Sequence, residues 1–400
     1  MDYARELGLA LQSTEDETIS GREITLNGRK LINFGSGTYM GWEQDNRLKD
    51  GAVKALQHYG TQFGSSRAYL SLGLYEELED LLTQMFKAPV IATASSTLGH
   101  LSALPILIGE NDAVILDHQV HASVSMACQL LKANGVRIEM IRHDSLEMLE
   151  NRIQKLSHSH DRIWYLADGI YSMHGAFAPF EGMMELLQRY EQLRLYIDDA
   201  HSISWTGENG AGKAAPFFAG HPQVFVTGSL CKSFSAAGGV LVFPDETSRE
   251  LVRKCGGTMI FSGPIQPPML GAAVASARIH LSDELPARQA DLLRKIRLFN
   301  RAAAEKGLNL ASYDETPIRF VSVGNTELGY QMAKSLLNQG YYVNIAAYPS
   351  VPRNKSGLRI SINHHLEPRD ILNLVNLIAE HMPESLKLEN RVSTEVLTEL

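Results

Sequence analysis

The sequence predicts an α/β fold with a mostly parallel central sheet, helices on both faces of that sheet, and a smaller C-terminal α+β domain. Between about residues 88 and 243, short apolar runs alternate with amphipathic stretches of helical length. Apolar strands that alternate with helices are typical of a parallel sheet buried on both faces. Beyond about residue 285 a new set of strand and helix patterns begins, which indicates a second unit.

The elements of the first unit follow in order along the chain. Apolar runs predict strands at 89–93, 112–117, 136–141, 162–167, 193–198, 223–228 and 239–243. Helical periodicity predicts helices between several of them, at 96–108, 122–134, 145–156 and 182–192. Upstream, two more predicted helices, 45–59 and 74–87, flank a segment rich in glycine and serine, YGTQFGSSRAYLSLG.

The second unit has fewer predicted elements. A mostly helical pattern at 267–307 leads into strands near 317–323, 341–346 and 357–362, with helices near 326–339 and 368–381. We therefore expect an N-terminal segment (1–45), a large domain (46–285) and a small C-terminal domain (286–400). The last fifteen residues are polar, so we expect them to be loosely held.

The composition excludes several classes of function. The 400 residues are 44% hydrophobic and carry a net charge of −8, which disfavours nonspecific binding to nucleic acid or to an anionic membrane surface. The longest apolar runs fall short of the roughly 18–20 residues that span a bilayer, and the acidic N-terminal stretch lacks the apolar core of a secretory signal. Three widely spaced cysteines suit a reducing compartment. We expect a cytoplasmic protein without a membrane span.

Three side chains at neighbouring strand ends suggest a cofactor. Asp198 ends one predicted strand, His201 follows three residues later, and Lys232 follows the next predicted strand. Ligands of parallel sheets collect at the carboxyl ends of the strands. Lysine, aspartate and histidine together suit pyridoxal 5′-phosphate, because lysine binds its aldehyde and aspartate keeps its ring nitrogen protonated. Ser229, just before Lys232, offers a hydroxyl for the phosphate.

Each of these residues also has an ordinary structural explanation. A lysine after a strand is usually solvated, but the small apolar residues after Lys232 disfavour an exposed position. Asp198 could cap the next segment, although a buried carboxylate at a strand end needs a partner. His121 follows the strand 112–117 and is either a structural histidine or one that lies over a flat ring. Arg359 alternates with apolar residues in a strand, where it is either exposed or binds a substrate carboxylate.

Two other patterns are weaker. GENGAGK at 207–213 satisfies the glycine spacing of a nucleotide-binding phosphate loop, but Ala214 follows where that loop needs Ser or Thr, and no apolar strand precedes it. We expect a flexible glycine loop near the cofactor instead. The histidine pairs at 118/121, 158/160 and 364/365 lack a third ligand at usable spacing, so we expect no metal site.

The ordered set of motifs resembles the α-oxoamine synthases, a family that includes 8-amino-7-oxononanoate synthase, 5-aminolevulinate synthase and serine palmitoyltransferase. The resemblance runs from about residue 30 to 382 and comprises NFGSGTYMG, YGTQFGSSR, DHQVHAS, DGIYSMHGAFAP, IDDAHS, GENGAG, TGSLCKS, FSGPIQPP and SGLRISIN. It implies a fold-type I pyridoxal phosphate enzyme that works as a homodimer with its active site at the subunit interface.

The resemblance also implies a role for each candidate residue. Lys232 matches the lysine that binds the cofactor covalently, and Asp198 matches the partner of the pyridine nitrogen. His201 matches the histidine near the phenolic oxygen, and His121 the one stacked on the ring. Ser229 takes a phosphate-contacting place where relatives usually have Thr. The backbone amides of Ser96 and Thr97 match the phosphate turn, and Arg359 matches the arginine that binds the substrate carboxylate.

Several positions depart from the family pattern. Relatives usually have Asn at Gly37, Ser at Cys231, and His at the position of Tyr75. The usual glycine–aromatic pair of the phosphate turn is Ser96–Thr97, and the usual HSxGxxG reads HSISWTG, which puts Trp205 beside the site. The segment FSGPIQPP has Gly263 where a hydroxyl pair usually begins, which puts a phosphate contact across the subunit interface in doubt.

These residues lead to an expected reaction. We expect a decarboxylative condensation of an α-amino acid with an acyl thioester, carried by coenzyme A or a carrier protein, to give an α-aminoketone. The remodelled substrate residues favour a role in secondary metabolism or signalling. An aminotransferase that uses the same Lys232 and Asp198 is one alternative. A noncatalytic partner subunit is another, although such subunits tend to lose the lysine that this chain keeps.

Overall fold

The structure is a computed structural model that describes residues 2–383 and 386–387. The expectation of a loosely held end at 386–400 therefore lies almost wholly outside the described residues. The chain folds into two units. The large unit comprises Asp45–Tyr171 and Phe177–Pro286. The small unit comprises the residues up to Gln44, the short segment Ser172–Ala176, and the residues from Ala287 onward.

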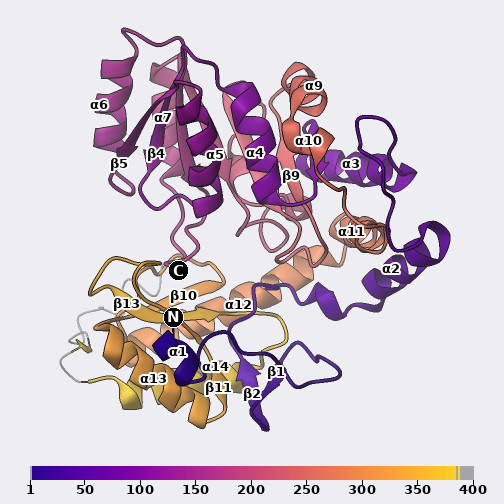
Figure 1. Cartoon of the computed structure of the whole chain (residues 1–400). Coiled ribbons are helices and arrows are strands. Elements are labelled where there is room, and N and C mark those ends of the chain that lie inside the picture. The colour runs from indigo at the N-terminus through magenta and orange to yellow at the C-terminus, as the bar shows by residue number, and fades with distance from the viewer. Residues whose placement is uncertain (1, 384–385, 388–400) are drawn as a thin grey trace. The chain divides into compact units, whose positions relative to one another are not determined.

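A mostly parallel sheet forms the centre of the large unit (Figure 1). In the described part of the chain it has seven strands in the order β3-β9-β8-β7-β6-β4-β5, of which β4 to β8 pair in parallel and β9 pairs antiparallel with both β3 and β8. The strands are β3 (Val90–Thr93), β4 (Ala113–Asp117), β5 (Arg137–Ile141), β6 (Ile163–Asp168), β7 (Leu193–Asp198), β8 (Val224–Ser229) and β9 (Gly239–Val242). Each lies within one or two residues of its predicted position, so the predicted α/β class is confirmed.

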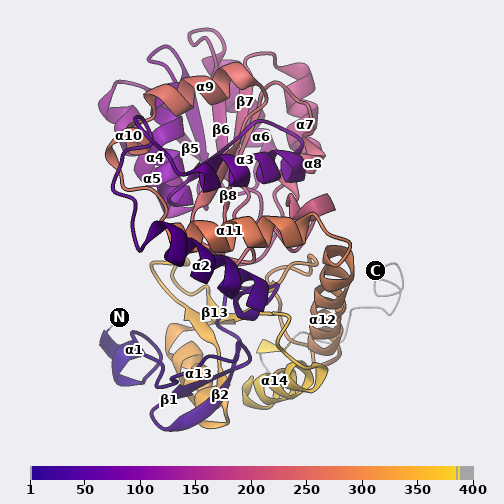
Figure 2. The ribbon, with the colours of Figure 1, turned by 90° about the vertical axis from the view of Figure 1, so that its right-hand side faces the viewer.

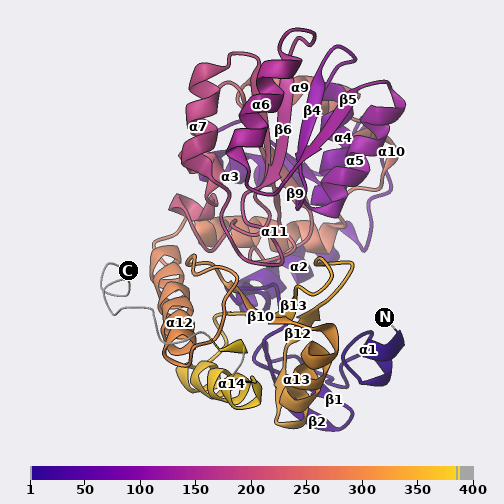
Figure 3. The same ribbon diagram turned by 90° about the vertical axis from the view of Figure 1, so that its left-hand side faces the viewer.

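Helices bury both faces of this sheet because its strands are apolar on both sides. One core cluster joins alternate strand residues to α4 (Ser96–Leu107), α5 (Ala122–Ala133), α9 (Glu246–Cys255) and α10 (Gly257–Phe261). The other cluster joins the remaining strand residues to α3 (Gly73–Phe86), α6 (Leu146–Leu156), α7 (Phe180–Arg189) and α11 (Pro267–His280). Figure 2 shows α3 and α11 crossing one face, and Figure 3 shows α4 and α5 on the side of the strands opposite α6 and α7.

Short polar side chains begin several of these helices. Ser95 caps α4 by accepting from the Leu98 amide, and Asp45 caps α2 (Asn46–Tyr59) in the same way through the Arg47 amide. These side chains satisfy amide groups that lack a partner in the first turn. The glycine loop 207–213 contains a 3₁₀ turn, η2 (Glu208–Gly210), and leads into the four-residue helix α8 (Ala214–Phe217).

The small unit holds an antiparallel sheet, ordered β10-β13-β12 among the described residues. Its strands are β10 (Ile318–Gly324), β12 (Asn344–Ala346) and β13 (Ser356–Ser361), and its helices are α12 (Leu285–Glu305), α13 (Thr326–Asn338) and α14 (Pro368–His381). The predicted strand 341–346 is wrong as one element. Tyr341–Tyr342 (β11) pairs instead with β2 (Arg29–Asn33) of a separate sheet, and only Asn344–Ala346 joins β13.

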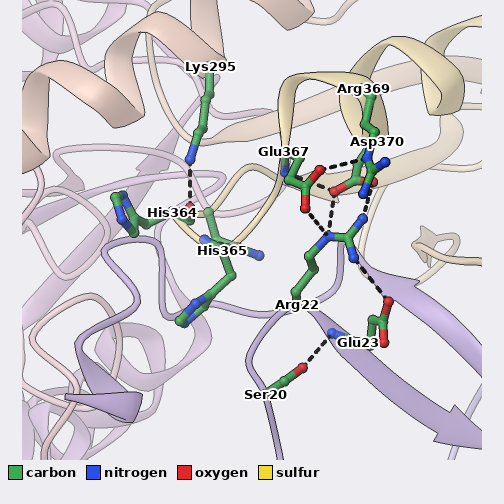
Figure 4. Close-up of polar contacts among 10 residues, drawn as sticks. Ser20, Arg22, Glu23, Lys295, His364, His365, Glu367, Arg369 and Asp370 are labelled. Carbon is green, nitrogen blue, oxygen red and sulfur yellow. Dashed lines mark hydrogen bonds and ion pairs between the residues drawn. The ribbon is translucent and has the colours of Figure 1, made fainter. Parts of the chain in front are cut away.

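The N-terminal residues also belong to the small unit. A short helix, α1 (Asp2–Glu6), precedes the hairpin β1 (Glu23–Leu26) and β2 (Arg29–Asn33), and η1 (Trp42–Gln44) follows it. Arg22 binds Asp370 of α14 through two hydrogen bonds of 2.8 and 2.6 Å, which Figure 4 shows beside the contacts of Arg22 with Glu23 and Glu367. This bidentate pair fixes the entry of the hairpin onto the small unit.

Candidate active site

The sheet topology brings three polar residues to one edge of the large unit. Asp168, Asp198 and Ser229 end the neighbouring parallel strands β6, β7 and β8. Asp168 lies opposite Asp198 in the register, and Asp198 lies opposite Thr227. Lys232 follows Ser229 by three residues. The strand ends therefore bring together the aspartate and the lysine that the sequence singles out.

Asp198 is held as a buried carboxylate. Burial opposes its ionisation, but the contact with His100 and the electrostatic interactions with Lys232 and His121 lower its pKa to about 2. His100 Nε2 lies 3.2 Å from Asp198 Oδ2, and the Ala200 amide donates to Oδ1 at 3.1 Å. A permanently ionised acceptor at a strand end suits a positively charged partner such as a protonated ring nitrogen.

The second buried acid, Asp168, behaves in the opposite way. Burial and the negative charge of Asp198 raise its pKa well above the ordinary value. Its Oδ1 accepts from the His121 amide at 2.9 Å. Two like charges side by side cannot both ionise cheaply, so Asp198 carries the charge and Asp168 positions the backbone of His121.

His121 begins α5 at its N-cap. Its Nδ1 accepts from the Ser123 amide at 3.3 Å and lies 2.7 Å from the Ser123 hydroxyl, which leaves the proton of the neutral ring on Nε2. The side chain is exposed to solvent, yet the surrounding protein desolvates the ring enough to lower its pKa, an effect that Lys232 strengthens and Asp198 opposes. A neutral ring with an exposed face suits stacking on a flat cofactor.

The loop that carries Lys232 is tied to α11 through buried hydrogen bonds. Ser204 Oγ lies 3.1 Å from the Ser233 carbonyl oxygen and 2.7 Å from His280 Nε2. Burial lowers the pKa of His280 to about 4, so its ring is neutral. Ser276 of α11 donates to the Phe234 carbonyl at 2.6 Å. These bonds fix the backbone directly after the lysine.

Ser96 and Thr97 open α4, where backbone amides point away from the helix. Ser95 satisfies the amides of Leu98 and Gly99, so those of Ser96 and Thr97 remain directed at the helix end, which favours an anion such as phosphate. A Cβ atom on Gly239 would lie 2.5 Å from the Ser96 nitrogen. The glycine thus lets this turn pack closely against β9, beside the end of β8 that carries Ser229.

The glycine loop 207–213 binds a carboxylate of the protein itself. Asp199 Oδ2 accepts from the amides of Lys213 and Ala214 at 2.9 and 2.8 Å, and the Lys213 ammonium lies 5.4 Å from the centre of the Phe177 ring. The amides at the end of the loop are therefore directed at Asp199, and those of Gly210, Ala211 and Gly212 donate to carbonyl oxygens of the same segment rather than to an external phosphate. This geometry disfavours the nucleotide-binding interpretation of GENGAGK.

Two of the departures from the family pattern acquire a structural role. Tyr75 is buried, its hydroxyl accepts from the Ile265 amide at 2.6 Å, and the Arg67 guanidinium lies 3.8 Å above its ring. Trp205 is also buried and donates from Nε1 to the His201 carbonyl at 2.6 Å. Trp205 therefore fixes the backbone of His201.

Arg359 lies on β13 of the small unit. Its Nε donates to the Ser172 carbonyl at 2.7 Å, and Nη1 lies 3.4 Å from the Ser361 hydroxyl. Arg359 also interacts with the side chain of Tyr39. Burial raises the pKa of Tyr39, and the charge of Arg359 and a hydrogen bond to it oppose that rise. Arg359 therefore lies close to the segment that contains Gly37. The structure thus groups Arg359 and Tyr39 within the small unit, whereas the other candidate residues belong to the large unit.

The described residues contain no group of three side chains able to hold a metal ion. Of the histidine pairs, His364 Nδ1 lies 3.0 Å from Asp291 and His365 Nε2 lies 2.9 Å from Glu43. Within the same residues, none of the helices is both long and apolar enough to cross a membrane.

Comparison with known proteins decides the family. The sequence profile for aminotransferase class I and II matches residues 29–378. The 8-amino-7-oxononanoate synthase of Symbiobacterium thermophilum is 31% identical over 337 residues, which are 84% of each chain. The chain belongs to this family as an α-oxoamine synthase. It is thus a pyridoxal 5′-phosphate-dependent acyltransferase, as the resemblance implies.

Further comparisons agree. The 8-amino-7-oxononanoate synthase of Dechloromonas aromatica is 30% identical over 380 residues, which cover 93% of this chain and 95% of the relative. A structure of serine palmitoyltransferase from S. paucimobilis, solved with PLP and myriocin, is 25% identical with a TM-score of 0.86 over 95% of both chains. The fold-type I prediction is therefore confirmed.

The residues of this synthase fit its cofactor. A buried carboxylate with a pKa of about 2 suits the ring nitrogen, the exposed ring of His121 suits the ring face, and the close turn permitted by Gly239 suits the phosphate. The comparisons support condensation of an amino acid with an acyl thioester.

Sequence reasoning missed four residues of the synthase: His100, Asp168, Asp199 and Ser204. Asp168 ends its strand as Asp198 does, so the same signal identifies it. Asp199 adjoins Asp198, and its place in the sequence indicates only a cap or a surface ion pair. His100 is a polar residue inside an otherwise apolar helix, which is a weaker signal, and Ser204 has none.

Proposed function

We propose that this synthase condenses a small α-amino acid with an acyl thioester, releases carbon dioxide and the thiol, and forms an α-aminoketone. The observation that carries the proposal is the charge arrangement at the strand ends, where ionised Asp198 interacts with both Lys232 and His121. Family membership supports the reaction class, and the residue roles below are inferred from the geometry.

Binding of the cofactor divides among three elements. The Ser96 and Thr97 amides at the start of α4 bind the phosphate, with the Ser229 hydroxyl nearby. Asp198 would keep the ring nitrogen protonated, and His121 would pack against the face of the ring. When bound, pyridoxal phosphate supplies an electron sink that stabilises negative charge at the amino-acid Cα.

Two residues handle the amino acid. Lys232 Nζ takes the Cα proton, and Arg359 binds the carboxylate through its guanidinium. His201, whose backbone is held by Trp205, orients the substrate beside the phenolic oxygen. This orientation directs proton removal to one bond of the Cα.

The substrate surroundings support an acyl chain unlike those of housekeeping enzymes. Cβ atoms on Gly37 and Gly263 would meet nothing within 4 Å, so both positions leave open space. Together with Trp205, these departures support a product of secondary metabolism or a signalling molecule.

We also propose that the synthase is a homodimer. Large apolar side chains are exposed on the large unit, among them Tyr69 at 88% and Phe261 at 89%. Ser66, near Tyr69, donates to the carbonyl of Ile260 in α10, so the segment around Tyr69 adjoins the end of α10 that carries Phe261. Their burial against a second copy would remove apolar surface from water.

The test begins with the purified holoenzyme and glycine, alanine and serine in separate titrations. We expect the visible band of the bound cofactor to shift with one of them. An acyl thioester, supplied either on coenzyme A or on a carrier protein, should then release carbon dioxide and free thiol in equal amounts and give an aminoketone detectable by mass spectrometry.

Two variants sharpen this test. Lys232→Ala should bind the cofactor without a stable visible band and form no product. Arg359→Lys keeps the charge but loses bidentate binding, so it should weaken the amino-acid titration while leaving cofactor affinity unchanged. Transfer of the amino group to the cofactor without thioester consumption would contradict the synthase and favour an aminotransferase.

A further inference from the structure

His100 connects Asp198 to the interior of the large unit. It lies on α4, is 0% exposed, and places Nδ1 2.9 Å from the Tyr196 hydroxyl and Nε2 3.2 Å from Asp198 Oδ2. Tyr196 comes from β7, two residues before Asp198. The imidazole therefore bridges two residues of one strand.

The donors and acceptors of these three side chains fix where the protons lie. Ionised Asp198 can only accept, so the proton of His100 lies on Nε2. Burial and the nearby Asp198 charge raise the pKa of Tyr196 well above its ordinary value, so the phenol keeps its proton. Tyr196 Oη then donates to Nδ1, and the Nε2 proton of His100 lies beside the carboxylate. Nδ1 is therefore hydrogen-bonded to Tyr196, whereas Nε2 faces Asp198 Oδ2 at 3.2 Å outside hydrogen-bond geometry and is otherwise a buried nitrogen without a hydrogen-bond partner among the described residues.

The position of His100 on its helix is as informative as its contacts. Ser96 begins α4, and His100 lies four residues later, one turn along the helix. Gly99 holds this turn close to the sheet, because a Cβ there would lie 3.3 Å from both Thr93 Oγ1 and a Leu241 methyl. One rigid helix thus presents amides at its start and an imidazole to Asp198.

We propose that His100 is a positioning residue that keeps Asp198 oriented toward the cofactor ring nitrogen, so that α4 sets both the phosphate and the ring-nitrogen ends of the site. The proposal rests on the proposed role of Asp198. It goes beyond that role because it makes the strength of the Asp198 interaction depend on a side chain outside cofactor contact.

A histidine that only fills space in the core would respond to substitution differently from a positioning residue. The titratable groups around His100 and Asp198 are Asp168, Lys232 and His121, and each of them interacts with Asp198 independently of His100. Loss of a packing residue would weaken folding and leave the cofactor unaffected. Loss of a positioning residue would act on the ring nitrogen specifically.

The experiment compares two cofactors in equilibrium dialysis against His100→Phe and His100→Gln. Natural pyridoxal phosphate carries the ring nitrogen, and its 1-deaza analogue has carbon there. Gln keeps an N–H at the reach of Nε2, whereas Phe fills the space without a donor. We expect Phe to weaken binding of the natural cofactor about 10- to 100-fold, as losses of supporting hydrogen bonds often do, and Gln by less than about threefold.

The analogue and the absorption spectrum give the specific readouts. Both variants and the wild type should bind the deaza analogue with equal affinity. The visible band of the His100→Phe holoenzyme should change between pH 6 and pH 9, where the wild-type band stays constant. If Phe is not accommodated, His100→Asn, which is one methylene shorter than Gln, takes its place with the same expected loss.

Two results would overturn the proposal. One is an equal loss of affinity for both cofactors, which means that His100 only packs. The other is natural-cofactor binding within twofold of wild type in the Phe or Asn variant. The variant Asp198→Asn distinguishes failure of this proposal from failure of the proposed function. If Asp198→Asn also leaves binding of the natural cofactor and its spectrum unchanged, the role assigned to Asp198 is wrong. If Asp198→Asn has a large effect and the His100 variants have none, only the role assigned to His100 is wrong.

Discussion

At the scale of single residues, three neighbouring carboxyl groups have different pKa values because their surroundings differ. The contact with His100 lowers the pKa of Asp198 to about 2, while burial raises the pKa of Asp199 to about 6 and also raises the pKa of Asp168 well above its ordinary value. Burial alone would raise all of them. The difference is that Asp198 faces basic side chains, whereas Asp199 interacts with neutral donors, namely the Ser202 hydroxyl and the Lys213 and Ala214 amides.

Asp199 gives a pH-dependent prediction. Its folded pKa of about 6 exceeds the ordinary value of 3.8, so the folded chain binds more protons than the unfolded chain in that window. The contribution of this group to stability therefore falls as the pH rises through the window. Between pH 5 and pH 7.5 this loss amounts to about 1–2 kcal/mol.

Asp199→Asn should remove that loss. The amide oxygen can still accept from Lys213 and Ala214, and no charge is buried above pH 6. Urea unfolding of both proteins at pH 5 and pH 7.5 measures the effect. We expect the variant to gain stability relative to wild type as the pH rises, and a parallel pH dependence of the two proteins would contradict the assignment.

At the scale of elements, the crossing of α2 and α11 depends on two facing glycines. A Cβ on Gly271 would lie 2.3 Å from the Gly51 carbonyl oxygen, and one on Gly51 would lie 2.7 Å from the Gly271 oxygen. The two backbones are thus in direct contact. Neither neighbour is a flexible side chain that could move aside.

Gly271→Ala should therefore destabilise the large unit. Overpacking of this kind typically costs about 1–3 kcal/mol. Gly73→Ala is the matched control, because Gly73 opens α3 and a Cβ there meets nothing within 4 Å. Thermal unfolding should show a lower midpoint for Gly271→Ala and an unchanged or higher one for Gly73→Ala. Equal unfolding midpoints for the two variants would mean that α2 and α11 move apart to accommodate the methyl group without loss of stability.

The elements also show what sequence patterns can predict. The strands of the central sheet are predictable because burial on both faces makes them continuously apolar. The β1–β2 hairpin was missed although Asn27–Gly28 marks it, with φ of +51° and +70° at the turn. Helix α9 was missed because it buries little apolar surface, Val252 being its fully buried residue.

The candidate site divides in the same way. Residues that sit at strand ends, such as Asp198 and Lys232, follow from the pattern of the strands. His100 and Ser204 act through tertiary contacts with β7 and α11, and no spacing along the chain encodes these contacts. The split of the segment at 341–346 also depends on which strand each half meets in space.

At the scale of the whole molecule, each of the two units contributes residues that we propose bind the cofactor or the amino acid. The groups proposed for the cofactor, from Ser96 to Lys232, belong to the large unit, and Arg359 with Tyr39 belongs to the small unit. Segment Ser172–Ala176 belongs to the small unit although it interrupts the large unit in sequence. Arg359 binds this segment through the Ser172 carbonyl.

This division predicts two separate patterns of amide hydrogen exchange. Addition of pyridoxal phosphate to the apoprotein should protect the start of α4 and the segments after β7 and β8, because a ligand stabilises the residues that bind it. Addition of the amino acid to the holoenzyme should extend protection to β13 and to Ser172–Ala176. Arg359→Lys should keep the first pattern and lose the second. Protection of β13 by the cofactor alone would show that the two units respond together and that Arg359 is not specific to the amino acid.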